Sequence, residues 1–161
     1  MKYYLPKLGI AVWLVALVSC QKQPDYPIQP VIELETLSKL EMVQNAANID
    51  SITIVLNYTD GDGDLGTDGN EYNVFLKDSR TGLESFYRIP QLPQNGGSSG
   101  ISGQIELINY TTCCIFTDGQ PPCTPSTSTP TNTMYYTIYI KDRAGNISNE
   151  VITPEITLFC N

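Results

Sequence analysis

The sequence contains no histidine, and this absence removes several kinds of active site. Without an imidazole the chain cannot activate a serine or cysteine nucleophile through histidine, and it lacks the nitrogen ligand common in catalytic zinc sites. Long apolar runs are scarce as well. The run at residues 8–18 has eleven residues, too few to cross a hydrocarbon layer of roughly 30 Å. Because the chain has no histidine, any enzymatic activity would have to rely on carboxylates.

The short apolar run has the setting of a secretory signal, because Lys2 and Lys7 precede it and a small residue and Cys20 follow it. The cleavage region lacks an A-x-A pattern, and its letters, LVSC at residues 17–20, resemble a bacterial lipobox. We therefore expect residues 1–19 to be a lipoprotein signal peptide and Cys20 to carry the lipid. Two acyl chains suffice for stable membrane anchoring. The alternative is an ordinary signal peptide with a chance cysteine.

Positive charge is also scarce. The chain has 9 basic and 17 acidic residues, for a formal net charge of −8. The expected signal peptide removes Lys2 and Lys7 and no acidic residue, which leaves seven basic against seventeen acidic residues and a net charge of −10. Since nucleic-acid affinity comes largely from Lys and Arg side chains that neutralise phosphates, this balance argues against a nucleic-acid partner.

Four cysteines remain beyond Cys20, and in an exported chain an even number suggests disulfides. They are Cys113, Cys114, Cys123 and Cys160. Neighbours on an extended segment point to opposite faces, so the two adjacent cysteines are expected to have different partners. We predict that one pairs with Cys123 and the other with Cys160. A zinc site built from all four is the competing interpretation, but it needs a spacing such as C-x2-C, which is absent.

Short strand-like segments follow a Pro-rich stretch. Residues 20–30 are expected to form a tether, and residues 31–161 a single domain. About seven segments have the composition of strands: 31–37, 51–59, 72–78, 83–90, 104–110, 134–142 and 147–160. No long amphipathic helix pattern is present. The chain is therefore predicted to fold as an all-β, immunoglobulin-like (fibronectin type III-like) antiparallel β-sandwich, with a small barrel as the alternative.

Alternation within these segments predicts which side chains face the core. The rows expected to point inward are Ile52, Ile54, Leu56 and Tyr58; Tyr72, Val74 and Leu76; and Met134, Tyr136, Ile138 and Ile140. The segment 38–50 is interpreted as a loop or a single helical turn. Pro154, within the last predicted strand, suggests an edge position or a bulge.

One segment, DGDGDLGTDGNE at residues 60–71, concentrates carboxylates directly after a predicted strand. Calcium takes about six to eight oxygen ligands, and its loops place carboxylates at alternate positions. The candidate ligands are Asp60, Asp62, Asp64, Asp68 and Glu71, at positions one, three, five, nine and twelve of the segment. Leucine stands at position six, where an EF-hand has glycine, and the flanks are strands. The loop therefore resembles the wider class of D-x-D-x-D loops rather than an EF-hand.

A second loop is expected to reach the acidic one. In the immunoglobulin topology, the loops after the second and sixth strands lie at the same end of the sandwich. This placement brings Asp142 and Asn146 near the acidic loop and makes Asp142 a possible sixth protein ligand.

The charge pattern favours a bound cation, because no Lys or Arg lies between Lys39 and Lys77 and crowded carboxylates destabilise one another. Structural Ca²⁺ is therefore the predicted cofactor. Two alternatives remain open: Arg143 neutralises the loop without a metal, or the segment is a solvated Asp/Gly turn. A catalytic carboxylate pair is disfavoured, because one short loop offers neither a cleft nor two different environments.

Together, the lipobox, the Pro-rich tether, the strand followed by DGDGDLG and the closing YIKDRAGNISN resemble small immunoglobulin-like lipoproteins of Bacteroidetes. The resemblance implies a protein anchored through Cys20 in the cell envelope, at the outer membrane, on a face left open. It implies a non-enzymatic binding or structural accessory module with an envelope protein or a glycan as partner.

The alternative is a carbohydrate-binding accessory protein of a surface glycan-uptake system. Tyr135 and Tyr139 could then stack on sugars, although cross-strand packing explains them more simply.

Overall fold

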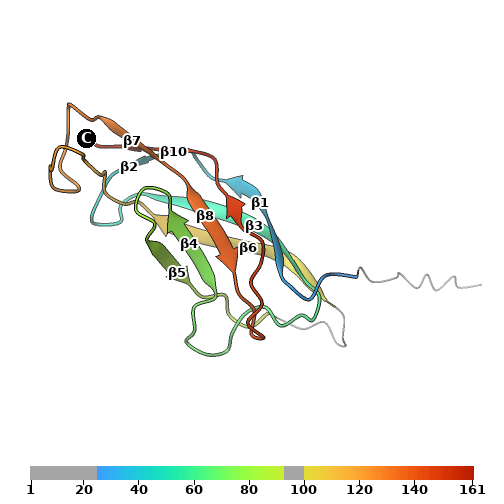
Figure 1. Cartoon of the computed structure of the whole chain (residues 1–161). Coiled ribbons are helices and arrows are strands. Elements are labelled where there is room, and N and C mark those ends of the chain that lie inside the picture. Colours follow the sequence, from blue (N-terminus) through green and yellow to red (C-terminus); the bar gives the residue numbers. More distant parts are fainter. Residues whose placement is uncertain (1–24, 93–99) are drawn as a thin grey trace, which may run out of the picture.

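The computed structural model describes residues 25–92 and 100–161, which contain β-strands and no helix (Figure 1). The strands are β1 (Val31–Leu37), β2 (Glu41–Val43), β3 (Ser51–Asp60), β4 (Val74–Asp78), β5 (Glu84–Tyr87), β6 (Ile101–Tyr110), β7 (Thr131–Met134), β8 (Tyr136–Ile140), β9 (Val151–Ile152) and β10 (Ile156–Phe159). No helix that could cross a membrane occurs in this part of the chain. The predicted signal peptide, Cys20 and the tether as far as residue 24 lie outside the described residues.

The strands form three sheets, with the orders β1-β3-β6, β5-β4-β8-β9 and β2-β10-β7. Each pair is antiparallel except β2 with β10, which is parallel. A hydrophobic core collects side chains from all three sheets, including Leu56 of β3, Leu76 of β4 and Leu158 of β10. The predicted all-β, sandwich-like fold is confirmed, while its immunoglobulin-like character stays a prediction.

Alternation along β3 and β8 explains how the core is filled. In β3 every second side chain is buried, from Ile52 to Tyr58, as the sequence predicts. In β8 the buried side chains are Tyr136, Ile138 and Ile140. Because side chains on a strand alternate between two faces, these rows point into the space between the sheets.

Two segments that the sequence predicts as single strands, 134–142 and 147–160, are each interrupted in the structure. Met134 is buried as expected, but it ends β7, which pairs with β10, whereas β8 begins at Tyr136 and pairs with β4. The last predicted strand divides around Pro154, which has no N–H to donate to a ladder, into β9 at a sheet edge and β10. Segment 38–50 contains the short strand β2 instead of a helical turn.

Tyr72 does not belong to the inward row in which the sequence placed it. It precedes β4, which begins at Val74, and its side chain is exposed. Val74 and Leu76 are buried as expected. The prediction for Tyr72 is therefore wrong, because the strand starts two residues later than the alternation suggests.

The two disulfides join Cys113 to Cys123 and Cys114 to Cys160, and this confirms the predicted pairing. The first closes a local loop, and the second ties down the chain directly after β10. We call this the disulfide end of the sandwich, and the end at Asp60 the acidic end. The β3–β6 ladder runs between the two ends (Figure 1). Its pair Ser51–Tyr110 lies toward the disulfide end, and its pair Asp60–Ile101 lies at the acidic end.

Candidate metal centre

Two core strands deliver buried carboxylates to the acidic end. Asp60 is the last residue of β3 and continues its inward row, and its side chain is fully buried. Asp142 lies two residues after Ile140, the last residue of β8, and continues that row in the same way, with 5% of its surface exposed. Carboxylates are rarely buried unless they are paired or bind a metal. Both positions therefore need a compensating partner.

The acidic loop brings two further carboxylates to these. One oxygen from each of Asp60, Asp62, Asp64 and Asp142 lies within 4.8 Å of the others. Asp62 is exposed and Asp64 is half-buried. We call these four residues the aspartate cluster. The expected approach of Asp142 to the acidic loop is confirmed.

Hydrogen bonds satisfy only part of the aspartate cluster. The backbone N–H of Leu65 donates to Asp60 Oδ2 at 2.8 Å, and that of Ala144 donates to Asp64 Oδ2 at 2.9 Å. The other oxygen of each, Asp60 Oδ1 and Asp64 Oδ1, is buried and has no hydrogen-bond partner among the described residues. Leaving a buried polar atom unpaired costs about 1–3 kcal/mol, more when it is charged. A cation among the four side chains would satisfy both atoms.

Asp142 is held by the turn that follows it. The backbone N–H of Asn146 donates to Asp142 Oδ1 at 2.7 Å, and the Asn146 side-chain amide donates to Oδ2 at 2.8 Å. Asn146 therefore lies near the cluster as expected, and it positions Asp142 through these two bonds. Each carboxylate oxygen keeps a further lone pair for a second contact.

Burial and mutual repulsion disfavour the charged forms of the cluster. The pKa of Asp60 is raised to about 6, first by burial and then by the nearby charge of Asp62, against the lowering effect of the Leu65 N–H. The pKa of Asp64 is raised first by burial and then by the charges of Asp142 and Asp62. The cluster thus has high-energy carboxylates at neutral pH, and a bound cation would stabilise them.

Arg143 lies beside the cluster without forming an ion pair with it. Its guanidinium Nη1 donates to the carbonyl oxygen of Gly66 at 3.1 Å, and its backbone N–H donates to the Asp64 carbonyl at 3.4 Å. The ion pairs within residues 25–92 and 100–161 join other residues. The Arg143 charge does lower the pKa of Asp64, but less than burial raises it. Neutralisation by this arginine is therefore incomplete.

Two predicted ligands, Asp68 and Glu71, lie outside the cluster. Both are exposed, and neither belongs to the group of converging oxygens. The cause is Leu65, which is fully buried in the core and pins the loop immediately after Asp64. An EF-hand uses a glycine at this position for a sharp turn that lets the chain wrap the ion. Here the buried Leu65 side chain holds the loop against the core, and the residues after it, including Asp68 and Glu71, lie away from the cluster.

The segment before β1 packs against the same loop, a contact that no sequence pattern predicted. The backbone N–H of Gly61 donates to the Pro27 carbonyl at 2.7 Å. A Cβ at position 61 would lie 2.3 Å from the Tyr26 carbonyl oxygen, so only glycine fits. The glycines between the aspartates were the one sequence feature that could have indicated this contact, because glycine lets two backbone segments approach closely.

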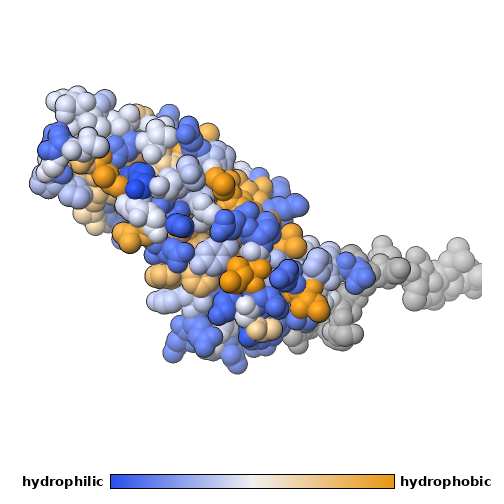
Figure 2. All heavy atoms as spheres, in the orientation of Figure 1, coloured by the Kyte–Doolittle hydropathy of each residue, from blue (hydrophilic) through white to orange (hydrophobic). Residues whose placement is uncertain are grey.

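The aromatic residues on the outer face of the β5-β4-β8-β9 sheet pack mainly on one another. The ring of Tyr139 stacks on that of Phe75, with centroids 4.7 Å apart, and its hydroxyl donates to Glu84 at 3.1 Å. Tyr135 is exposed and stands between β7 and β8. On the face seen in Figure 2, hydrophobic residues form separate small patches among hydrophilic ones. Cross-strand packing therefore accounts for Tyr139.

The aspartate cluster offers a set of anionic oxygens from two loops, which suits a hard metal cation. No nitrogen or sulfur ligand joins these oxygens among the described residues. The chain has been compared with family models, curated proteins and solved structures, and none of them matches it.

Proposed function

We propose that the protein is a non-enzymatic, lipid-anchored β-sandwich module whose acidic end binds a structural Ca²⁺ ion. The observation that carries the metal assignment is the pair of buried, unpartnered oxygens, Asp60 Oδ1 and Asp64 Oδ1, in a cluster of four aspartates. A solvated Asp/Gly turn would expose its carboxylates to water instead. Buried acceptors that lack a hydrogen-bond partner and lie beside other carboxylates are suited to bind a cation.

The ligand set favours calcium over other metals. Zinc prefers cysteine and histidine, and neither type lies in the cluster. Magnesium demands near-octahedral geometry, keeps several waters and is usually held by only one or two carboxylates. Calcium accepts irregular oxygen shells and more carboxylates, and backbone carbonyls or water can complete the shell. Four aspartates from two loops therefore support Ca²⁺.

The proposed ion has a structural role. It would join the loop after β3 to the loop after β8, which belong to different sheets. Without it, side-chain contact between the two loops rests on the bond from Ala144 to Asp64 and on the Arg143 guanidinium at Gly66. Calcium would thus fix the relative positions of the two sheets at this end.

The position of the tether supports a placement near the membrane. Tyr26 and Pro27 contact Gly61, so the chain reaches the acidic end directly before β1. Six residues separate the proposed lipid on Cys20 from Pro27, so the two can lie at most about 25 Å apart along a fully extended chain. The acidic end would therefore face the cell-envelope membrane, which we propose to be the outer membrane, and the disulfide end would face away.

A non-enzymatic role is supported by the arrangement of the carboxylates. Oxygens of Asp60, Asp64 and Asp142 accept backbone N–H groups, and the cluster lies at a sandwich end between two loops. Asp60 and Asp62 differ in burial, but a catalytic pair must also face a substrate across a cleft. The chain has no histidine to supply another proton acceptor.

Calorimetric titration of residues 21–161 with Ca²⁺ tests the proposal, since every described strand lies within this part of the chain. We expect one site per chain with a Kd of about 10⁻⁴–10⁻³ M, the range of extracellular modules. Asp62→Ala should weaken binding about tenfold or more, because it removes a cluster carboxylate.

Asp68→Ala is the matched control, because Asp68 is also exposed and lies on the same loop but outside the cluster. It should leave the affinity unchanged. The metal assignment is contradicted if no heat is detected at about 10 mM Ca²⁺, well above the expected Kd. Equal losses in both variants would show only a diffuse attraction of cations to an acidic loop.

A further inference from the structure

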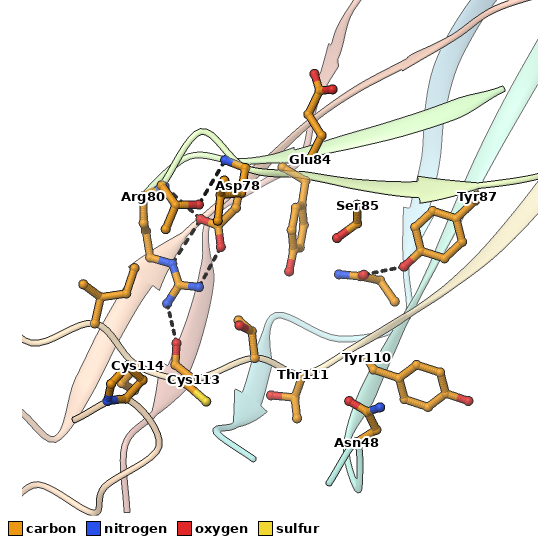
Figure 3. A pocket seen from close by; sticks show the side chains of 17 residues that line it. Asn48, Asp78, Arg80, Glu84, Ser85, Tyr87, Tyr110, Thr111, Cys113 and Cys114 are labelled. Carbon is orange, nitrogen blue, oxygen red and sulfur yellow. Dashed lines mark hydrogen bonds and ion pairs between the residues drawn. The ribbon is translucent and has the colours of Figure 1, made fainter. Parts of the chain in front are cut away.

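A sizeable cavity lies at the disulfide end, away from the aspartate cluster. It has a volume of about 560 Å³ and opens between the β4–β5 hairpin and the segment that follows β6 (Figure 3). Small-molecule sites in proteins have volumes of about 300–1,000 Å³. We call this cavity the hairpin cleft. Its size is sufficient for a ligand larger than an ion or a water molecule.

Two of the three charged side chains that line the hairpin cleft, Asp78 and Arg80, neutralise each other. The Arg80 guanidinium donates to Asp78 through Nε at 3.1 Å and Nη2 at 2.7 Å, and through Nη1 to the Cys113 carbonyl at 3.2 Å. The two side chains are only 11% and 15% exposed, respectively. Glu84 points out of the cleft in Figure 3 and accepts the hydroxyl of Tyr139. The cleft therefore offers no unpaired cation to a ligand, and its one carboxylate without a cationic partner points away from it, which disfavours phosphates and carboxylates.

Uncharged polar groups remain available at the mouth of the cleft. The side chains of Asn48, Ser85 and Thr112 line it and have no hydrogen bond to another of the described residues. Deeper in the cleft, the hydroxyl of Tyr87 donates to Asn109 Oδ1 at 2.5 Å. The cleft thus combines a satisfied polar floor with free amide and hydroxyl groups above it. Such groups can both donate and accept hydrogen bonds.

An aromatic ring completes the lining. Tyr110, the last residue of β6, lines the cleft with 52% of its surface exposed. An exposed tyrosine presents a flat apolar face together with a polar tip. A sugar ring matches this combination, because its C–H face stacks on an aromatic ring while its hydroxyls take hydrogen bonds from neutral groups. We propose that the hairpin cleft binds a neutral saccharide.

The walls of the cleft are covalently fixed. Cys113 is bonded to Cys123, and Cys114 to Cys160, so both adjacent cysteines in the wall are held by disulfides. The Arg80 bond to the Cys113 carbonyl joins this wall to the opposite hairpin. A pre-organised site loses less conformational entropy on binding. This suits a saccharide, whose individual hydrogen bonds with a protein replace equally good ones with water.

The proposed saccharide site is independent of the proposed calcium site, since the two lie at opposite ends of the sandwich. The test is a glycan array carrying neutral and acidic glycans, probed with the full chain in a detergent that has no sugar headgroup. Calorimetry with the strongest soluble neutral oligosaccharide follows. We expect neutral glycans to be bound, and Tyr110→Ala to weaken binding about tenfold or more, as expected when an aromatic stack is removed.

Tyr72→Ala is the matched control, since Tyr72 is a similarly exposed tyrosine that lies beside the acidic end and lines another hollow. It should leave saccharide affinity within about twofold. An array without any bound neutral glycan, binding of acidic glycans alone, or equal losses in the two variants overturns the proposal. Repeating the array in EDTA separates the two proposals: saccharide binding should persist, and the calcium titration fails or succeeds independently.

Discussion

At the acidic end of the sandwich four aspartates converge from two loops, and at the disulfide end four cysteines form two covalent bonds. Both ends join segments that are distant in sequence: Asp60 to Asp142 at one, and Cys114 to Cys160 at the other. The disulfide end is joined permanently in an oxidising compartment. In our proposal the acidic end depends on calcium and on pH, because its carboxylates repel one another when ionised.

This contrast suggests a separate role for each end of the proposed membrane-anchored module. The disulfide end carries the hairpin cleft, whose walls stay fixed whatever the ion concentration. The acidic end contacts the segment at Tyr26 and Pro27 that leads to the proposed anchor. Conditions that change the acidic end would therefore alter how the domain is held, and would leave the cleft unchanged.

Removing the longer disulfide should produce the largest effect. In the paired variant Cys114→Ala/Cys160→Ala, a link across 46 residues is lost, and loop-closure entropy predicts a loss of about 4 kcal/mol of unfolding free energy. The pair Cys113→Ala/Cys123→Ala opens a link across 10 residues and should cost about 3 kcal/mol. Urea unfolding of both in saturating calcium measures the difference. A larger loss from the shorter link would show that loop closure is not the main source of the stabilisation.

Calcium should stabilise the acidic end somewhat less than the longer disulfide stabilises the other. At a concentration of 100 times its Kd, a ligand adds about 2.7 kcal/mol to the unfolding free energy, which corresponds to a Tm increase of about 10 °C for a domain of this size. Thermal unfolding in Ca²⁺ and in EDTA measures this shift. Mg²⁺ at the same concentration should produce a smaller one. Identical Tm values in Ca²⁺ and EDTA would contradict the proposal that calcium stabilises the acidic end.

Asp60→Asn should stabilise the protein in EDTA and destabilise it in calcium. In EDTA the variant should be more stable than the wild type by about 1–2 kcal/mol at pH 7.5, because it removes a buried carboxylate whose pKa is raised to about 6. In calcium the wild type should regain the advantage. Asp68→Asn, at an exposed position outside the cluster, should change neither value. A wild type that stays the more stable protein in EDTA would contradict the repulsion described at this end.

The smallest expected effect is the pH dependence in EDTA. Asp60 binds its proton more tightly in the folded state, since its pKa is raised from 3.8 to about 6, and the pKa of Asp64 is raised in the same direction. The folded state then holds more protons than the unfolded state, so stability falls as pH rises from about 4 to about 6. Asp50 acts oppositely, because Lys39 lowers its pKa, and its contribution is lost only below the ordinary value of 3.8.

Urea midpoints between pH 4 and pH 7.5 measure this slope. We expect a decline of about 1–2 kcal/mol in EDTA, and little decline in saturating calcium, where the ion keeps the carboxylates ionised. Calcium affinity should itself weaken below about pH 6, because protons compete for Asp60. Stability that rises from pH 5 to pH 7 in EDTA would contradict the assigned pKa direction.

Much of the fold follows from local sequence patterns. The alternation from Ile52 to Tyr58 predicts the inward face of β3, and the adjacent cysteines predict two different disulfide partners. Continuing the same period by one step reaches Asp60, and the corresponding step from Ile140 reaches Asp142. The burial of both carboxylates was therefore readable from the sequence, because a strand's alternation does not stop at its last apolar residue.

Other features depend on tertiary contacts that no local pattern contains. Counting ligand positions as in an EF-hand included Asp68 and Glu71, but the burial of Leu65 in the core redirects the loop before it reaches them. The division of strands near Tyr135 and Pro154 reflects a change of pairing partner, which requires knowledge of the neighbouring strands. The hairpin cleft joins residues from five separate segments, so its existence could not be predicted from any one of them.

The central claim is that the aspartate cluster is a calcium site, and a crystal structure of the protein grown with Ca²⁺ tests it most directly. We expect a strong density peak among Asp60, Asp62, Asp64 and Asp142, with carboxylate oxygens at about 2.3–2.6 Å from it. Asp60 Oδ1 and Asp64 Oδ1 should be among these ligands. Water alone at this position, or the Arg143 guanidinium turned into the cluster, would contradict the claim.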